Sequence, residues 1–266
     1  MVTFPLRVRT LIDLHCHLLP GLDDGARDLS VALNMARIAA ADGIETIVCT
    51  PHILPGLYHN TGPCIRSATN ELRIALAEAN IAIDLLSGSD AHMTTRFAEK
   101  LAAGEILPLA KSRYVLVEPP HHVAPLQLQA FFLELLFVGY VPVLTHPERL
   151  TWIGSGYSTI KRLARSGVWM QITSDSLVGK FGRQPRYWAE RMLAEGLVHL
   201  LASDAHDVHN RPPILSAGRQ AVARRLGERE ATNLVSTRPR GVIENEAPSR
   251  LPLPPDCISF KLPHTA

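Results

Sequence analysis

Cysteine is scarce in this sequence, and its few copies show no regular spacing. The four residues Cys16, Cys49, Cys64 and Cys257 form neither a CxxC pair nor a Cys/His zinc-finger pattern. A disulfide framework or a structural zinc site therefore has little support. This usage indicates a reducing compartment.

Long hydrophobic runs are also missing. No stretch approaches the roughly 18 apolar residues that a membrane-spanning helix needs. The first ten residues, MVTFPLRVRT, lack the apolar run of about 7–15 residues that precedes the cleavage site of a secretory signal. We therefore expect a soluble, cytoplasmic protein with no membrane insertion.

A block of one charge sign is absent as well. The 27 basic and 25 acidic residues are spread along the chain and leave a formal charge of +2. This balance gives no sign of a nucleic-acid or membrane-surface partner. With 266 residues, 46% of them hydrophobic, the chain can bury one sizeable core, so we expect a single catalytic domain.

Short β-branched runs recur between amphipathic stretches, which is the pattern of repeated strand–helix units. The first helix is expected to begin at Asp28 or Ser30 and to end at Gly43, and 125–137 reads as a helix packed against a parallel sheet. The sequence predicts an α/β fold: a single-domain, distorted (β/α)7 TIM-like barrel. The seven expected strands are Leu11–His17, Ile44–Thr50, Ile81–Ser87, Tyr114–Glu118, Val141–His146, Val168–Thr173 and Val198–Ser203.

The two ends of the chain fall outside this repeat. We expect an N-terminal extension over 1–10, a catalytic domain over 11–246, and a peripheral Pro-rich tail over 247–266. The prolines Pro248, Pro252, Pro254 and Pro255 of the tail remove backbone donors and disfavour regular structure.

Polar residues end nearly every predicted strand. In a parallel barrel the functional side chains lie on the loops after the carboxyl ends of the strands. His15 and His17 share one face of the first strand and could bind one ion, although a lone His-x-His pair is weak evidence. Later strands end in further ligand types, and imidazoles with carboxylates suit Zn, Mn or Fe better than Mg or Ca. These later residues are His52, Asp90, Glu118, His146, Asp204 and His206.

Three positions beside these residues have competing interpretations. Asp23 reads as an ordinary turn residue, whereas Asp24 is predicted to bind metal because of its place beside the histidines. Arg149 and Arg211 each follow a ligand candidate. A surface ion pair is the plain interpretation of either arginine, but beside a metal centre a guanidinium fork matches phosphate oxygens.

The ordered series resembles the PHP (polymerase and histidinol phosphatase) superfamily. In detail it is similar to the bacterial manganese-dependent protein-tyrosine phosphatases of capsule and exopolysaccharide loci. The resemblance runs from about residue 11 to about residue 243 and is carried by IDLHCHLLPGLDDGA, TPH after the second strand, VLTHPERL and ASDAHDVHNRPP. The combination is specific, whereas IDLHCH alone marks only the superfamily.

The resemblance implies a centre of three divalent ions, with manganese first and iron or zinc as alternatives. It assigns His15, His17 and Asp204 to one ion. Asp90 would bridge to a second ion, held with Glu118 and His146. Asp24, His52 and His206 would hold the third ion. Arg149 and Arg211 match the phosphate-contacting arginines of the family.

One position departs from the family. Asp90 stands where the family usually has glutamate, so this carboxylate is one methylene shorter. His92, two residues further on, would share the face of Asp90 and could assist it if the strand continues, but an exposed loop histidine is the expected interpretation.

The implied substrate is phosphotyrosine on the tail of a cognate bacterial tyrosine kinase that governs polysaccharide export. No cysteine is followed six residues later by arginine, so the loop of thiol-dependent tyrosine phosphatases is absent. His121, His122 and His209 are candidate acids by position, although each is expected to be a surface or supporting histidine. Three alternatives remain: a small-molecule phosphatase of the histidinol-phosphatase type, a nuclease, and a catalytically inactive binding module.

Overall fold

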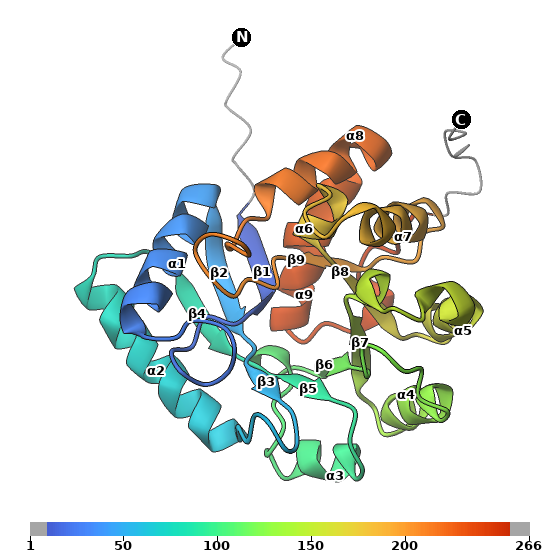
Figure 1. The fold of residues 1–266 in the computed structure, drawn as a ribbon, viewed down its shortest axis with the longest axis horizontal. Helices are drawn as coiled ribbons and strands as arrows, with labels where there is room; N and C mark the ends of the chain where they lie inside the picture. The colour runs from blue at the N-terminus through green and yellow to red at the C-terminus, as the bar shows by residue number, and fades with distance from the viewer. Residues whose placement is uncertain (1–9, 256–266) are drawn as a thin grey trace.

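Parallel strands alternate with helices throughout residues 10–255, which are the residues that the computed structural model describes (Figure 1). The strands are β1 (Leu11–Cys16), β2 (Ile44–Cys49), β3 (His52–Ile53), β4 (Asp84–Ser87), β5 (Asp90–His92), β6 (Tyr114–Glu118), β7 (Val141–Thr145), β8 (Trp169–Thr173) and β9 (Leu200–Ala202). The predicted extension 1–10 and the last part of the predicted tail, 256–266, lie almost wholly outside the described residues.

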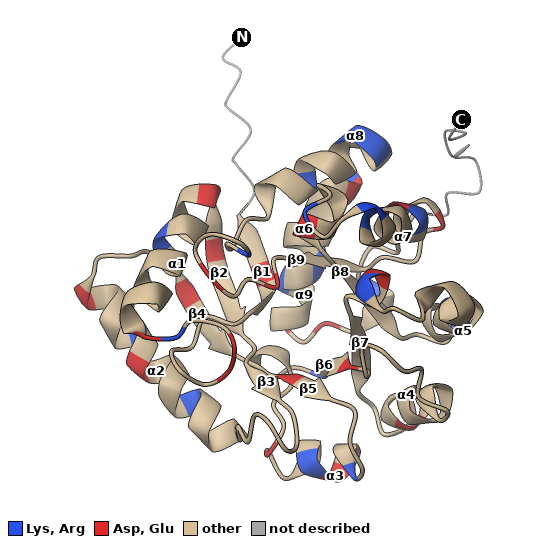
Figure 2. Cartoon of the chain, in the orientation of Figure 1, with Lys and Arg blue, Asp and Glu red and all other residues tan. Residues whose placement is uncertain are grey.

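Most helices surround the strands on the outside, whereas the last one lies behind the centre of the ring of strands (Figure 1). The helices are α1 (Leu29–Asp42), α2 (Gly62–Glu78), α3 (Phe97–Ala102), α4 (Leu128–Phe137), α5 (Ile153–Arg165), α6 (Ser174–Leu177), α7 (Arg183–Ala194), α8 (Ser216–Thr232) and α9 (Arg238–Ile243). Lysine, arginine, aspartate and glutamate are scattered over these helices without a one-signed face (Figure 2). No helix in the described part of the chain is long and apolar enough to cross a membrane.

The first helix begins and ends where its sequence predicts. Asp28 is its N-cap and accepts a hydrogen bond from the backbone N–H of Val31 at 2.9 Å. Gly43 closes it in the left-handed conformation, with φ of 90°, as glycine does at helix ends. The helix predicted over 125–137 begins later, at Leu128, and Phe137 on its outer face is 91% exposed.

The strands form two parallel sheets, ordered β1-β2-β4 and β3-β5-β6-β7-β8-β9. An α/β fold with parallel sheets is therefore confirmed. Regular pairing does not close a single barrel within residues 10–255. The outer edge of β1 instead reaches the segment after β9 through one parallel bridge between Cys16 and Ala205.

Two predicted strands continue as a second short strand in the other sheet. Pro51 interrupts the chain between β2 and β3, because proline has no N–H for the ladder. Gly88 lies between β4 and β5, where a Cβ atom would come within 2.9 Å of the Val48 side chain. Only seven strands were predicted because β3 and β5 have two and three residues, too few to show a periodic pattern, and the breaks before them carry both strands toward the centre.

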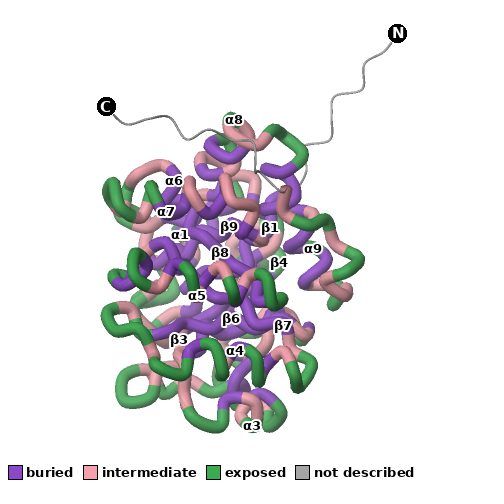
Figure 3. Tube along the Cα trace, turned by 90° about the vertical axis from the view of Figure 1, so that its right-hand side faces the viewer, coloured by how far each residue is buried: buried purple, intermediate pink, exposed green. Residues whose placement is uncertain are grey.

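The strands are buried almost end to end, as Figure 3 shows for the middle of the molecule. Strands covered on both faces read as continuous apolar runs, and β6 and β7 have this character. A second apolar cluster packs Leu14, Leu116 and Trp169 against Val242 of α9. This core fixes the strand ends, where the polar residues gather.

Candidate metal centre

All nine predicted donors lie at the carboxyl ends of strands or in the loops that follow them. Most of them are therefore placed by the rigid sheets, whereas Asp24 lies in the loop between β1 and the first helix. Three lie within short strands or at a strand end, namely His52, Asp90 and Glu118, and His15 lies within β1. The donors beyond strand ends are His17, Asp24, His146, Asp204 and His206.

The first group consists of His15, His17 and Asp204, all buried. The Nε2 atoms of His15 and His17 lie 3.1 Å apart. Asp204 Oδ1 lies 3.3 Å from the Nε2 atom of His15 and 3.4 Å from the Nε2 atom of His17. Donors about 2.1 Å from one ion lie about 3.0 Å apart in octahedral and about 3.4 Å apart in tetrahedral geometry. The spacing therefore matches donors that share one ion.

The second group consists of Asp90, Glu118 and His146. His146 Nε2 lies 3.6 Å from Glu118 Oε1. Asp90 Oδ2 lies 3.4 Å from His15 Nε2, so this carboxylate reaches both the first and the second group despite its shorter side chain. Its place agrees with the bridging position that the resemblance implies.

The third group consists of Asp24, His52 and His206, with His17 at its inner side. Asp24 Oδ1 lies 3.6 Å from His52 Nε2 and 3.5 Å from His206 Nε2. The Asp24 side chain is 50% exposed, whereas that of His206 is 7% exposed. This group is therefore the one that opens to solvent.

Several buried polar atoms in these groups have no hydrogen-bond partner. They are both carboxylate oxygens of Asp90, Oε2 of Glu118, and Nδ1 of His52 and of His146. A buried carboxylate without partners costs several kcal/mol unless it is paired or binds metal. The donor set, with nitrogen and oxygen atoms around unpartnered carboxylates, fits divalent transition ions.

Residues behind the donors fix the orientation of the two histidines of the first group. Gln171 Oε1 lies 2.8 Å from His15 Nδ1, and Asp23 Oδ2 lies 2.6 Å from His17 Nδ1. Such partners set the ring orientation of metal-binding histidines. Asp23 also accepts the N–H of Gly25, so it is the expected turn residue and a support for His17 as well. No pattern in the sequence indicated that Gln171 would support His15.

The charges of the neighbours act strongly on the buried imidazoles. Burial opposes protonation of His17, but Asp23 and Asp204 outweigh it and raise the pKa of His17 to about 10. Burial lowers the pKa of His146 to about 3 and that of His206 to about 2. Histidines of the second and third groups are therefore neutral near pH 7, the form that binds a metal ion.

Two of the donor residues have strained backbones. His146 has φ of 30° and Asp204 has φ of 52°, in the left-handed region that residues with a Cβ rarely adopt. Strain of this kind persists where the surroundings determine the conformation, and it concentrates at functional sites.

The two predicted arginines meet at one carboxylate. Arg149 Nη1 and Arg211 Nη2 both pair with Asp204 Oδ2, and neither arginine pairs with Glu148. Their guanidinium carbons lie 4.5 Å and 5.8 Å from the ring centre of Phe181. Both side chains are about a fifth exposed, at 18% and 23%, so further N–H groups can face an anion. No pattern in the sequence indicated that Phe181 would contact the two arginines.

Other candidate residues lie elsewhere. His122 and His209 are exposed, and His121 is partly buried beside His122. Cys16 is a buried core residue, as expected, and burial raises the pKa of its thiol well above its usual value. The prediction for His92 is wrong: it belongs to β5, and its Nε2 lies 2.6 Å from Glu118 Oε2.

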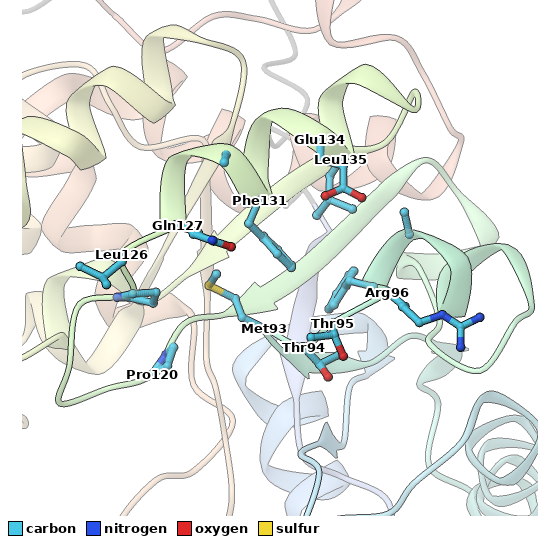
Figure 4. A pocket seen from close by; sticks show the side chains of 14 residues that line it. Met93, Thr94, Thr95, Arg96, Pro120, Leu126, Gln127, Phe131, Glu134 and Leu135 are labelled. Atoms are coloured by element: carbon cyan, nitrogen blue, oxygen red, sulfur yellow. The ribbon is translucent and has the colours of Figure 1, made fainter.

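A groove of about 730 Å³ is lined by residues that follow β5 and β6 in the chain (Figure 4). It lies between α3 and α4 and is lined mainly by apolar side chains, with Arg96 and Glu134 as its charged residues. Met93, which follows His92, lines it and donates its N–H to the carbonyl of Glu118 at 3.0 Å. The groove is therefore continuous with the strand ends that carry donors.

Comparison with known proteins gives close relatives. Tyrosine-protein phosphatase YwqE of Bacillus subtilis (strain 168) is 38% identical over 201 residues, covering 76% of this chain and 79% of the relative. Tyrosine-protein phosphatase CpsB of Streptococcus pneumoniae is 28% identical over 243 residues, covering 89% of this chain and 99% of the relative.

Solved structures agree with these relatives. A structure from a study of YwqE from Bacillus subtilis and CpsB from Streptococcus pneumoniae, described there as unique metal-dependent tyrosine phosphatases, matches with a TM-score of 0.86. It is 33% identical, over 89% of this chain and 96% of the other. Dihydropyrimidinase from Brevibacillus agri NCHU1002 shares the fold alone, at 13% identity and a TM-score of 0.51.

The family model of capsular polysaccharide synthesis proteins, CpsB/CapC, matches residues 11–244. This match spans every strand and the whole set of donor residues described above. The chain belongs to the CpsB/CapC family.

Proposed function

We propose that this chain is a metal-dependent phosphomonoester hydrolase that dephosphorylates phosphotyrosine in proteins. The observation that carries the proposal is the convergence of nine donor side chains into three groups around unpartnered buried carboxylate oxygens. The relatives named tyrosine-protein phosphatases support the choice of substrate. The two parallel sheets serve as a distorted seven-unit barrel, and the domain spans 11–246.

Three divalent ions are proposed, most readily manganese, with iron or zinc as alternatives. The first is assigned to His15, His17 and Asp204, and the second to Asp90, Glu118 and His146. Asp24, His52 and His206 complete the third. Bound ions would lower the pKa of water toward neutrality and offset the charge of the phosphoryl oxygens.

The arginines would bind and orient the phosphoryl group. Each guanidinium presents several N–H donors in a fixed plane, which suits the oxygens of a phosphate. Phe181 lies beside both guanidiniums, and both pair with Asp204, which places the two arginines next to the first donor group. Tyrosine is a tolerable leaving group, with a pKa of about 10, so little help from an acid is required.

A peptide substrate is favoured over a small molecule by the groove. Its apolar length lies open along the segments that follow β5 and β6, where residues that flank a phosphotyrosine can pack (Figure 4). A small phosphomonoester such as histidinol phosphate would gain nothing from it. We propose that the substrate is the phosphotyrosine tail of a cognate cytoplasmic kinase that acts in polysaccharide synthesis or export.

The test is hydrolysis of an aryl phosphate by the purified protein. We expect activity with added Mn²⁺, loss of activity with a chelator, and no response to a thiol-alkylating reagent, because Cys16 and Cys49 are buried and the exposed Cys64 belongs to none of the donor groups. Inhibition by alkylation together with resistance to the chelator would refute the proposal.

Replacing Arg211 by Ala tests the phosphate-binding role. Substrate use should weaken while the number of bound ions stays unchanged. Loss of an ion would instead show that Arg211 acts only by supporting Asp204, which it contacts at 2.5 Å.

The substrate class is tested by comparing a phosphotyrosine peptide with histidinol phosphate. Leu126 of the groove is fully exposed, at 105%, so Leu126→Ser should fold normally. We expect this variant to lose turnover of the peptide at low concentration and to keep turnover of a simple aryl phosphate. Faster turnover of histidinol phosphate than of the peptide would favour the small-molecule alternative.

A further inference from the structure

A four-residue sequence occurs twice at the strand ends of this chain. Ser89-Asp90-Ala91-His92 and Ser203-Asp204-Ala205-His206 are identical. In both copies the alanine is fully buried, and the serine is buried with its hydroxyl hydrogen-bonded. The aspartate of each copy belongs to a donor group, and so does the histidine of the second copy.

The backbones of the two copies differ, because Asp204 is left-handed and follows β9 whereas Asp90–His92 of the first copy form β5, yet both histidines belong to donor groups. Asp90 and His92 are two residues apart in β5, so alternation turns both side chains to the same face. In the parallel ladder, His92 is the direct partner of Glu118 on β6. The side chain of His92 is 19% exposed, so it is well covered but can still be reached.

The imidazole of His92 contacts the carboxylate of Glu118 directly. His92 Nε2 lies 2.6 Å from Glu118 Oε2, which is shorter than the about 3.0–3.4 Å between donors on one ion, so binding a common ion requires a shift of a few tenths of an ångström in one side chain. His52 Nδ1 lies 3.4 Å from the same oxygen, a spacing that fits a shared ion, and it has no hydrogen-bond partner.

We propose that His92 is a tenth donor of the metal centre, and that its Nε2 and Glu118 Oε2 face a common divalent transition ion with His52 beside them. These three residues form a group whose donor atoms all lie within 4.8 Å of one another. Two imidazoles and one carboxylate are a donor set that zinc uses. The extra imidazole therefore shifts the preference of this side of the centre toward zinc and away from manganese.

This inference rests on the proposed metal centre, and metal binding tests the two separately. The protein is stripped of metal and titrated with Zn²⁺ and with Co²⁺, whose visible absorption reports nitrogen ligation. Bound ions are counted by elemental analysis after dialysis. The variants are His92→Ala, His206→Ala as the matching position of the other copy, and His122→Ala as an exposed control.

We expect His92→Ala to weaken Zn²⁺ binding to one position at least tenfold and to change the Co²⁺ absorption, while His122→Ala binds like the original protein. Mn²⁺ binding should weaken less than Zn²⁺ binding. Identical Zn²⁺ affinities and Co²⁺ spectra for His92→Ala and His122→Ala would overturn the role of His92. Failure of the original protein to bind any ion would instead overturn the proposed function.

Discussion

Two buried charged clusters in this molecule are built in opposite ways. Under α8 and α9, Arg238 is fully buried and pairs with Glu230 through contacts of 2.7 Å and 3.2 Å. Its remaining donors reach the carbonyls of Pro252 and His199. At the strand ends, Asp90 is just as buried, yet neither of its oxygens has a hydrogen-bond partner.

The two clusters therefore have different roles: the one around Arg238 is structural, and the one at the strand ends is functional. A buried ion pair is tolerated when the protein itself supplies every partner, as it does for Arg238. A buried carboxylate without partners costs stability, and it persists only if it serves another purpose. Unpartnered donors at converging strand ends therefore indicate a place for a ligand from outside the chain.

The largest expected effect is at the unpartnered carboxylate. Asp90→Asn should reduce phosphatase activity about a thousandfold, equivalent to about 4 kcal/mol, because the proposed bridge between two ions is lost. The unfolding free energy of the metal-free protein should rise by about 1 kcal/mol or more, because the variant no longer buries an unpartnered charge. Activity assays and denaturant unfolding measure the two quantities.

The control for this variant is Asp84→Asn, which alters an exposed carboxylate at the start of β4. It should change neither activity nor stability. If Asp90→Asn instead unfolds the metal-free protein, the carboxylate is structural and the contrast between the two clusters fails.

The second effect should fall on stability. Glu230→Gln leaves Arg238 buried without its counter-charge, and this should lower the unfolding free energy by about 3 kcal/mol. Activity per folded molecule should stay unchanged. Glu228→Gln is the matched control, since Glu228 pairs with Arg219 at the surface and is 74% exposed. Equal stability of the two variants would contradict the prediction.

The third effect is a pH dependence of the unfolding free energy, and it arises beside the buried cluster of Arg238 and Glu230. Burial, together with Arg238, lowers the pKa of His199 to about 3, so the folded protein keeps this ring neutral. The unfolded chain takes up a proton below about pH 6.5, so this contribution to stability is present at pH 7.5 and is lost as the pH falls. Between pH 7.5 and pH 5 the loss should be at most about 2 kcal/mol.

His199→Phe measures that contribution. The ring stacks on Trp169, with centroids 5.0 Å apart, and phenylalanine preserves the stacking. Denaturant unfolding at the two pH values should show a smaller drop for the variant than for the original protein. An equal drop would assign the pH dependence to other groups.

The smallest effect is expected at Phe181. Phe181→Leu removes the aromatic face from Arg149 and Arg211, which should cost about 1 kcal/mol and raise KM several-fold with little change in kcat. Steady-state kinetics with a phosphotyrosine peptide measures this change. Phe137→Leu, at a 91% exposed position on α4, is the control. A fall in kcat alone would indicate a different role.

Much of the fold could be predicted from the sequence because its periodicity is regular. The predicted strand Tyr114–Glu118 matches β6 residue for residue, and Asp28 and Gly43 cap α1 as expected. The breaks after β2 and β4 could not be predicted. They depend on contacts, such as that between Gly88 and the Val48 side chain, which exist only once the sheets form.

The candidate site was predictable where donor residues end strands. A residue that directly follows a predicted strand is expected at the carboxyl edge of the sheet. The structure brings the nine predicted donors together at that edge. The supports Gln171 and Phe181 were missed because neither follows a strand end in the expected pattern. His92 was judged exposed because the short strand β5, which buries it, leaves no periodic signal in three residues.

The order of donors along the chain has a consequence for synthesis. His15 lies in the first strand, whereas Asp204 and His206 follow the last one, and the two ends meet through contacts such as the bridge between Cys16 and Ala205. A growing polypeptide on the ribosome therefore lacks part of the first and third groups until most of the domain has been made. Tight capture of metal must follow folding, so a stalled or truncated product would leave its early histidines free to bind metal non-specifically.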